Sequence, residues 1–152
     1  PEQSGLDDHR SDYVMALTVS PSPFFDLTNR LRLDRNSFSL RRNEVYFSIG
    51  PRFLRFNTSY ISLEREQTSD ELEAREELYN SLRWQISERW IATLESRRDL
   101  RDDGGQIRAG AGLQYLDECI GFGITVERNF TRDRDVEPST SVNFRFLLQN
   151  LG

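Results

Sequence analysis

The chain has 152 residues, a net charge of −5 and 30% charged residues, and its mean hydropathy is −0.66. This length corresponds to one domain, and the acidic balance argues against nucleic acid as a partner, because nucleic-acid-binding surfaces are basic. No stretch approaches the roughly 18 consecutive apolar residues of a membrane-spanning helix. The segment 1–12 lacks the basic and apolar regions of a signal peptide, so we expect the chain to start within a longer protein.

Segments of about ten residues alternate apolar and polar side chains along most of the sequence. Successive side chains of a β-strand point to opposite faces, so each such segment predicts a strand with one apolar face. The stretch 69–79 is rich in helix-favouring residues, and we expect a long, charged hairpin tip with helical character there. The predicted strands are 12–20, 25–34, 38–49, 53–64, 77–87, 90–99, 106–116, 120–130 and 139–149.

The last three predicted strands alternate most regularly. In the last one, Val142, Phe144, Phe146 and Leu148 interleave with mostly polar residues. Three consecutive strands with one apolar face and one polar, water-facing face are typical of a transmembrane β-barrel wall. We therefore expect one set of side chains to face lipid and the other to face the lumen. The lipid-facing set is Ile107, Leu113, Phe122, Ile124, Phe144 and Phe146, and the lumen-facing set is Arg108, Gln114, Glu127, Asn143 and Arg145.

The predicted connectors alternate between short and long. Outer-membrane barrels have short periplasmic turns and longer outer loops. If the last strand ends in the periplasm, the short connectors all lie on the periplasmic side. Trp84 and Trp90 flank one short turn and fit an aromatic girdle at that side of the membrane.

Nine strands cannot close a barrel of the usual even-numbered bacterial kind, and they leave two unpaired edges. We therefore predict that residues 1–152 are the C-terminal portion of a larger all-β transmembrane barrel, an incomplete antiparallel meander.

No residue pattern predicts catalysis, a cofactor or a metal site. His9 is the only histidine and lies in a polar segment, so a nucleophile–histidine arrangement is not expected. The glycine pairs at 110/112 and 121/123 sit inside alternating strands rather than before a helix, which argues against a dinucleotide loop. We expect them to leave room on the lumen face for a plug or a bound chain.

The predicted loop 131–138 carries Arg132, Asp133, Arg134 and Asp135. Arginine suits phosphate oxygens, so the loop could contact lipopolysaccharide phosphates or the divalent cations that bridge them. The alternative is a solvated loop whose internal ion pairs contribute little.

The stretch 113–152, with Asp117-Glu118-Cys119 followed by a glycine-spaced strand, resembles the C-terminal end of the lipopolysaccharide-assembly outer-membrane protein family, also called the organic solvent tolerance protein family. The segment SGLDDHRSDYV (4–14) adds to the resemblance, which points to the alphaproteobacterial type. The family implies a large barrel whose last strand, here 139–149, meets its first strand at a seam. Lipopolysaccharide passes through that lateral gate into the outer leaflet.

The resemblance also implies partners. These are a plug lipoprotein inside the barrel, periplasmic lipopolysaccharide bridge proteins that act through an N-terminal domain, and the barrel-assembly machinery in the bacterial outer membrane. The alternatives are a passive porin or autotransporter barrel, or a soluble lipid-carrying β-barrel whose apolar faces point inward.

Cys119 is the only cysteine, and the predicted turn would place it in the oxidising periplasm, where disulfides persist. An odd cysteine in such a compartment indicates either a partner outside this chain or a small buried side chain without a redox role. The family offers a partner cysteine in the N-terminal region. Enterobacterial members carry two adjacent cysteines at this turn, whereas this chain has one, so their disulfide pattern does not transfer unchanged.

Overall fold

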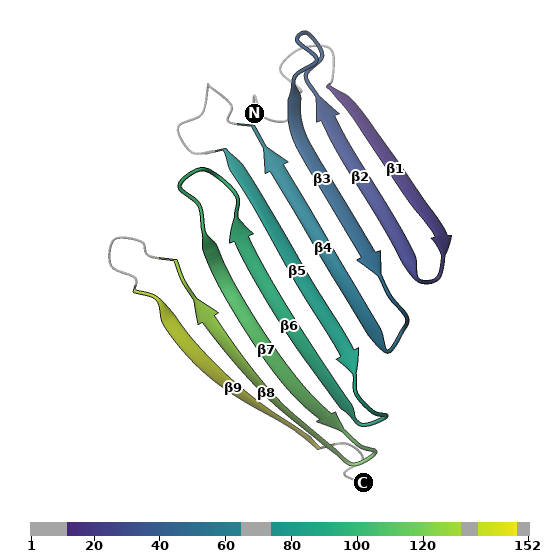
Figure 1. Cartoon of the computed structure of the whole chain (residues 1–152), viewed down its shortest axis with the longest axis vertical. Coiled ribbons are helices and arrows are strands. Elements are labelled where there is room, and N and C mark those ends of the chain that lie inside the picture. The colour runs from purple at the N-terminus through teal and green to yellow at the C-terminus, as the bar shows by residue number, and fades with distance from the viewer. Residues whose placement is uncertain (1–11, 65–73, 132–136, 149–152) are drawn as a thin grey trace.

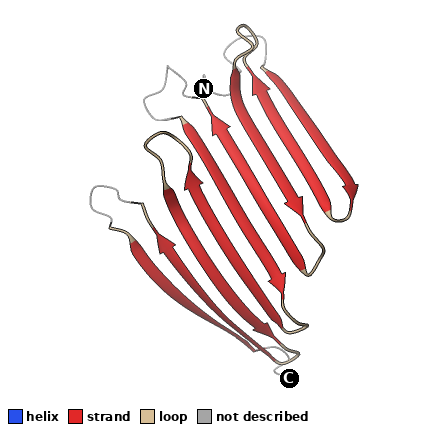
Figure 2. Cartoon of the chain, viewed as in Figure 1, coloured by secondary structure: helices blue, strands red, loops and turns tan. Residues whose placement is uncertain are grey.

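A computed structural model describes residues 12–64, 74–131 and 137–148, and these residues form a single nine-stranded antiparallel sheet. Each strand pairs with the next one in the chain, so the sheet is a meander, and the predicted fold class is confirmed (Figure 1). The described residues contain strands and connectors but no helix that could span a membrane (Figure 2). The strands are β1 (Tyr13–Ser22), β2 (Phe25–Leu33), β3 (Leu40–Ile49), β4 (Leu54–Leu63), β5 (Arg75–Gln85), β6 (Trp90–Asp99), β7 (Gln106–Leu116), β8 (Ile120–Asn129) and β9 (Ser139–Leu148).

The pairing register divides the side chains into two faces. Residues opposite each other on neighbouring strands point to the same face, so a row of partners can be followed across the sheet. We call the face that contains Phe25 and its partners the apolar face, and the face that contains Asp26 and its partners the polar face. From β2 to β9 the row through Phe25 is apolar: Phe25, Ile49, Phe56, Leu82, Leu94, Ala111, Val126 and Val142.

The helical hairpin tip predicted at 69–79 is wrong for residues 75–79, which belong to β5; residues 69–73 lie outside the described part of the chain. Arg75 pairs with Leu63 of β4, and Glu77 pairs with Ile61 of β4 and Asp99 of β6. Strands on both sides therefore satisfy the backbone hydrogen bonds of this segment. Helix propensity is only a weak preference, and this pairing overrides it.

An irregularity at the start of β3 explains why residues 39–43 do not alternate. Leu40 pairs with Leu33 and Arg42 pairs with Arg32, so Arg41 is an extra residue between these two pairs. A bulge of this kind redirects one side chain. Here the Arg41 guanidinium binds the carboxylate of Asp34 in the preceding connector.

The described residues contain no buried apolar side chain. The most deeply buried side chain among them is the polar Ser48, with 1% exposure. A sheet with an apolar face must cover that face with another layer. None of the described residues forms such a layer, since every strand lies in the one sheet. The cover must come from lipid or from protein outside the described residues.

Candidate functional site

The apolar face carries a belt of apolar side chains that is most regular on β7 to β9. Leu113, Ile124 and Phe144 form one row of this belt. Phe122 and Phe146 lie in the next row with their ring centroids 5.2 Å apart. The register therefore groups five of the six side chains that we predicted to face lipid. Ile107 is the extra residue of a bulge, because Arg97 of β6 pairs with Arg108 and Arg98 pairs with Gln106, so the register does not assign its face.

The two ends of the sheet differ as the sequence predicts. The connectors 23–24, 50–53, 86–89 and 117–119 have four residues or fewer, whereas those at 34–39, 64–74, 100–105 and 130–138 have six or more. All short turns lie at one end, which we call the short-turn end, and the others lie at the long-loop end (Figure 1). Trp84 and Trp90 lie near the short-turn end, and the Trp90 ring is 5.1 Å from that of Tyr115.

A hydrogen-bond network around Arg55 organises the polar face at the short-turn end. The Arg55 Nε donates to Ser48 Oγ over 2.7 Å, and a terminal nitrogen binds the Asp26 carboxylate. The other terminal nitrogen donates to the carbonyl oxygens of Pro23, at 2.9 Å, and Gly50, at 2.8 Å. Arg55 therefore joins the β1–β2 turn to the β3–β4 turn. The sequence alone did not predict this network, because its residues come from the two turns and from β2, β3 and β4. Only the strand pairing brings these segments together.

Closer to the long-loop end, the polar face carries ion pairs that cross the strands. Glu77 of β5 binds Arg97 of β6, at 2.7 Å, and Arg75 of its own strand, also at 2.7 Å. Arg108 of β7 lies 3.1 Å from the carboxylate of Glu127 on β8. The charges on this part of the polar face are thus largely paired with one another. Partly exposed pairs of this kind contribute little to stability, so the main consequence is a locally balanced charge.

The glycines of β7 and β8 leave less room than the sequence predicts. A Cβ atom on Gly112 would lie 2.6 Å from Thr93 Oγ1, and one on Gly121 would lie 3.1 Å from Leu147 Cβ. Neighbouring side chains therefore already fill the space over these two residues. Gly110 and Gly123 are more open, with nearest atoms at 3.6 and 3.9 Å. The prediction of room for a plug or bound chain is retained for these two positions only.

Cys119 is exposed and unpaired in the 117–119 turn, at the short-turn end. The neighbouring Asp117 accepts hydrogen bonds from the Glu118 amide, at 2.9 Å, and from the Tyr115 hydroxyl, at 3.1 Å. These bonds, with the amide contributing most and Arg89 adding a favourable charge, hold the pKa of Asp117 below its ordinary value. The turn thus presents a fixed negative charge beside the thiol at neutral pH.

Strand β9 lies at the edge of the sheet and pairs only with β8 among the described residues. The predicted seam residues are all exposed: Val142, Phe144, Phe146 and Leu148. The predicted lipopolysaccharide-contact residues Arg132 to Asp135, and His9, lie outside the described residues. Within the described part of the chain, no group of three or more His, Cys, Asp or Glu side chains is arranged to hold a metal ion.

Comparison with known proteins gives one family. The family described as "LptD: LPS transport system D" matches residues 1–90, whereas the resemblance seen in the sequence rested mainly on 113–152. A search of curated proteins finds no match. The family assignment made from the sequence is thereby confirmed, while the alphaproteobacterial type remains a prediction. Since the match covers more than half of a chain that folds as a nine-stranded, all-β sheet, this protein belongs to the LptD family of outer-membrane lipopolysaccharide transport proteins.

Proposed function

We propose that residues 1–152 form the C-terminal part of an LptD barrel wall, with the apolar face against outer-membrane lipid and the polar face lining the lumen. The observation that supports this most strongly is the uncovered apolar belt on a single-layer sheet. In the bilayer interior, lipid covers such a face, and strand pairing satisfies the backbone hydrogen bonds. The family match favours lipopolysaccharide transport over a passive porin, an autotransporter or a soluble lipid carrier.

The two unpaired edges support a specific role for β9. An exposed sheet edge offers free backbone donors and acceptors, and a closed barrel removes such edges. We infer that β9 pairs with the first strand of the complete barrel and forms one side of the lateral gate. Lipopolysaccharide would leave through this seam into the outer leaflet, and no chemical catalysis by this chain is required.

The partners proposed for the whole protein follow from the family. A plug lipoprotein would occupy the lumen against the polar face, and periplasmic bridge proteins would deliver lipopolysaccharide through the N-terminal domain. The apolar residues of β9 would also serve as the C-terminal signal that the barrel-assembly machinery reads.

Photo-crosslinking in cells tests the seam. A photoreactive residue in place of Asn143, at the centre of β9, should capture both an upstream barrel strand and lipopolysaccharide in the full-length protein. A matched probe in place of Thr93, in the same row of the polar face as Asn143 but within β6 and between two paired strands, should capture only its neighbours in the wall. Equal lipopolysaccharide capture at the two positions, or no upstream strand captured from β9, would refute the seam assignment.

A further inference from the structure

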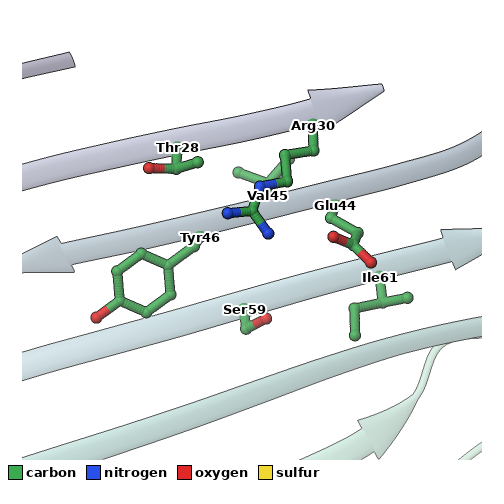
Figure 3. Close-up of a pocket in the computed structure, with 7 residues that line it drawn as sticks. All are labelled: Thr28, Arg30, Glu44, Val45, Tyr46, Ser59 and Ile61. Atoms are coloured by element: carbon green, nitrogen blue, oxygen red, sulfur yellow. The ribbon is translucent and has the colours of Figure 1, made fainter. Parts of the chain in front are cut away.

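Two adjacent grooves lie on the polar face between β2 and β7. The first has a volume of about 350 Å³ and is lined by Arg30, Tyr46 and Ser59, among others (Figure 3). The second, of about 370 Å³, is lined by Tyr79 and Arg97 and shares Ser59 with the first. The two grooves therefore adjoin at β4.

The two grooves differ in their charge. In the second groove, Glu77 is held by two arginines and Arg108 is held by Glu127 and Glu95, so the charges are paired. In the first groove, Glu44 is held by Arg42. Arg30 is exposed and makes no hydrogen bond or ion pair with any described residue. Figure 3 shows its guanidinium over the groove, between Tyr46 and Glu44. One cationic group is thus left available to a ligand.

Two tyrosine rings flank the centre of the adjoining grooves. Tyr46 pairs with Ser59, and Ser59 pairs with Tyr79, so the three side chains form one row on the polar face. Two strand spacings separate the tyrosines by about 10 Å. Their exposures are 44% and 38%. The Tyr46 hydroxyl donates to Asn57 Oδ1 over 3.2 Å, which restrains the ring while a face of it stays accessible.

This combination suits an acidic sugar. A tyrosine ring offers an apolar face and a polar tip, which complement the CH face and the hydroxyl groups of a pyranose. A guanidinium binds carboxylate or phosphate oxygens in a fork. Thr28 and Ser59 add hydroxyl groups on either side of Tyr46. Because the remaining charges in the grooves are paired, Arg30 supplies the charge complementarity, and it selects an anion.

We propose that the groove at Arg30 and Tyr46 binds a carboxylate- or phosphate-bearing sugar of the translocated glycolipid, with the saccharide continuing over Ser59 towards Tyr79. This inference rests on the proposed function, because it requires the polar face to line the lumen. The groove would hold the saccharide in the wall while the acyl chains move to the seam, four strands or more away from Tyr79.

Calorimetric titration of the full-length protein with its plug lipoprotein, in detergent, tests the proposal. The probe is the fully deacylated, phosphorylated core oligosaccharide of lipopolysaccharide. Arg30→Gln should weaken its binding by about tenfold or more, the effect of losing a charge-assisted hydrogen bond. Arg83→Gln is the matched control, because Arg83 is also an exposed arginine on the polar face without an ion pair to a described residue, and lies outside both grooves. It should change the affinity by less than about twofold.

Two further arms identify the ligand group. Tyr46→Phe should retain the affinity and Tyr46→Ala should lose it, because the ring and not the hydroxyl contacts the sugar. If dephosphorylation of the probe weakens binding to wild type but not to Arg30→Gln, the anion is a phosphate; if it has no effect on either, the anion is a carboxylate. Equal affinities for Arg30→Gln and Arg83→Gln, or no binding to wild type, would overturn the proposal.

A photoreactive residue in place of Tyr46 keeps the test decisive if a variant fails to assemble. Capture of lipopolysaccharide supports the saccharide groove, whereas capture of the plug lipoprotein alone overturns it. Surface delivery of lipopolysaccharide is measured separately on depletion of the wild-type protein. If delivery depends on the protein but the groove variants bind normally, the groove assignment alone fails. If delivery is unaffected by depletion, the proposed function itself fails.

Discussion

Val142 on β9 lies in the same continuous row of paired residues as Phe25 on β2. Phe25 is the residue of the belt nearest the short-turn end on β2, where the belt continues up to Leu33. Val142 is the residue of the belt farthest from that end on β9, because the next residue on this face is Thr140. From β2 to β9, over seven strand-to-strand steps, the belt therefore shifts towards the short-turn end by about its own height. This shift is measured against the rows of paired residues, which run perpendicular to the strands.

This shift predicts the tilt of the strands in the membrane. A shift of about one residue per strand, with about 3.4 Å per residue and about 4.8 Å between strands, corresponds to a tilt of about 35° if the belt lies parallel to the bilayer. Transmembrane barrels have strands tilted by about 35–45°. Polarised infrared spectroscopy of the full-length protein in oriented bilayers should give this angle. Strands close to the membrane normal would contradict the alignment of the belt with lipid.

Phe144→Arg should impair membrane assembly much more than Asn143→Arg. The first substitution places a charge on the apolar face, which costs about 2–4 kcal/mol near the bilayer centre. The second places the same charge on the polar face beside Thr125 and Gly123. Heat-modifiable gel mobility of the full-length protein measures the folded fraction. Equal tolerance of the two substitutions would show that the faces are assigned wrongly.

Arg55→Ala should lower the stability of the assembled barrel by about 2 kcal/mol, because a charge-assisted hydrogen bond to Asp26 is lost along with the links to two turns. Arg83→Ala is the matched control: Arg83 lies directly opposite Arg55 on β5 and makes no ion pair with a described residue. Urea unfolding midpoints in detergent report both variants. Similar midpoints for the two would show that the network does not stabilise the turns.

The connector 34–39 should depend on the charge of Asp34. Hydrogen bonds from the Ser37 amide, first, and then from the Ser37 hydroxyl and Arg41 hold the pKa of Asp34 far below its ordinary value. Because the pKa is lower in the folded state, the stabilisation is complete above the unfolded value of about 3.9 and is lost as the pH falls towards the folded value. Phe38, with φ of 57°, sits in the same connector and stacks on Tyr13.

Limited proteolysis tests this dependence, with the variants compared at neutral pH and the wild type followed as the pH is lowered. Asp34→Ala should expose the connector to cleavage, whereas Asp102→Ala, in the 100–105 connector, should leave it resistant. Wild type should become susceptible only when the pH is well below 3.9. Cleavage of wild type and Asp34→Ala at equal rates would show that the Asp34 carboxylate does not stabilise the connector.

Cys119→Ser should change the mobility of the full-length protein only on non-reducing gels, because we predict a disulfide between Cys119 and the N-terminal periplasmic region. Closing so long a loop would restrict the unfolded chain by about 4–5 kcal/mol in the chain-entropy model. The exposed position of the thiol at the short-turn end is compatible with such a partner. Identical mobility of both proteins without reductant would leave the cysteine without this role.

Strand alternation in the sequence predicted all nine strands, with boundaries within about two residues, because one face of each strand is apolar and the other is polar. It failed where a different interaction decided the structure. Pairing with β4 and β6 extended β5 back to Arg75 against helix propensity, and the bulge at Arg41 interrupted the alternation of β3. The Arg55 network and the groove at Arg30 could not be predicted, since both depend on the register between strands.

Site-directed spin labelling tests the central claim, that the apolar face contacts membrane lipid, most directly. Single labels at Phe144 and Asn143, adjacent on β9 but on opposite faces, are introduced into the full-length Cys119→Ser protein in bilayers. The label at 144 should be accessible to oxygen dissolved in the lipid and protected from a water-soluble nickel reagent, and the label at 143 should show the reverse. If both labels are accessible to the nickel reagent, or if 143 is the oxygen-accessible position, the apolar face does not face lipid.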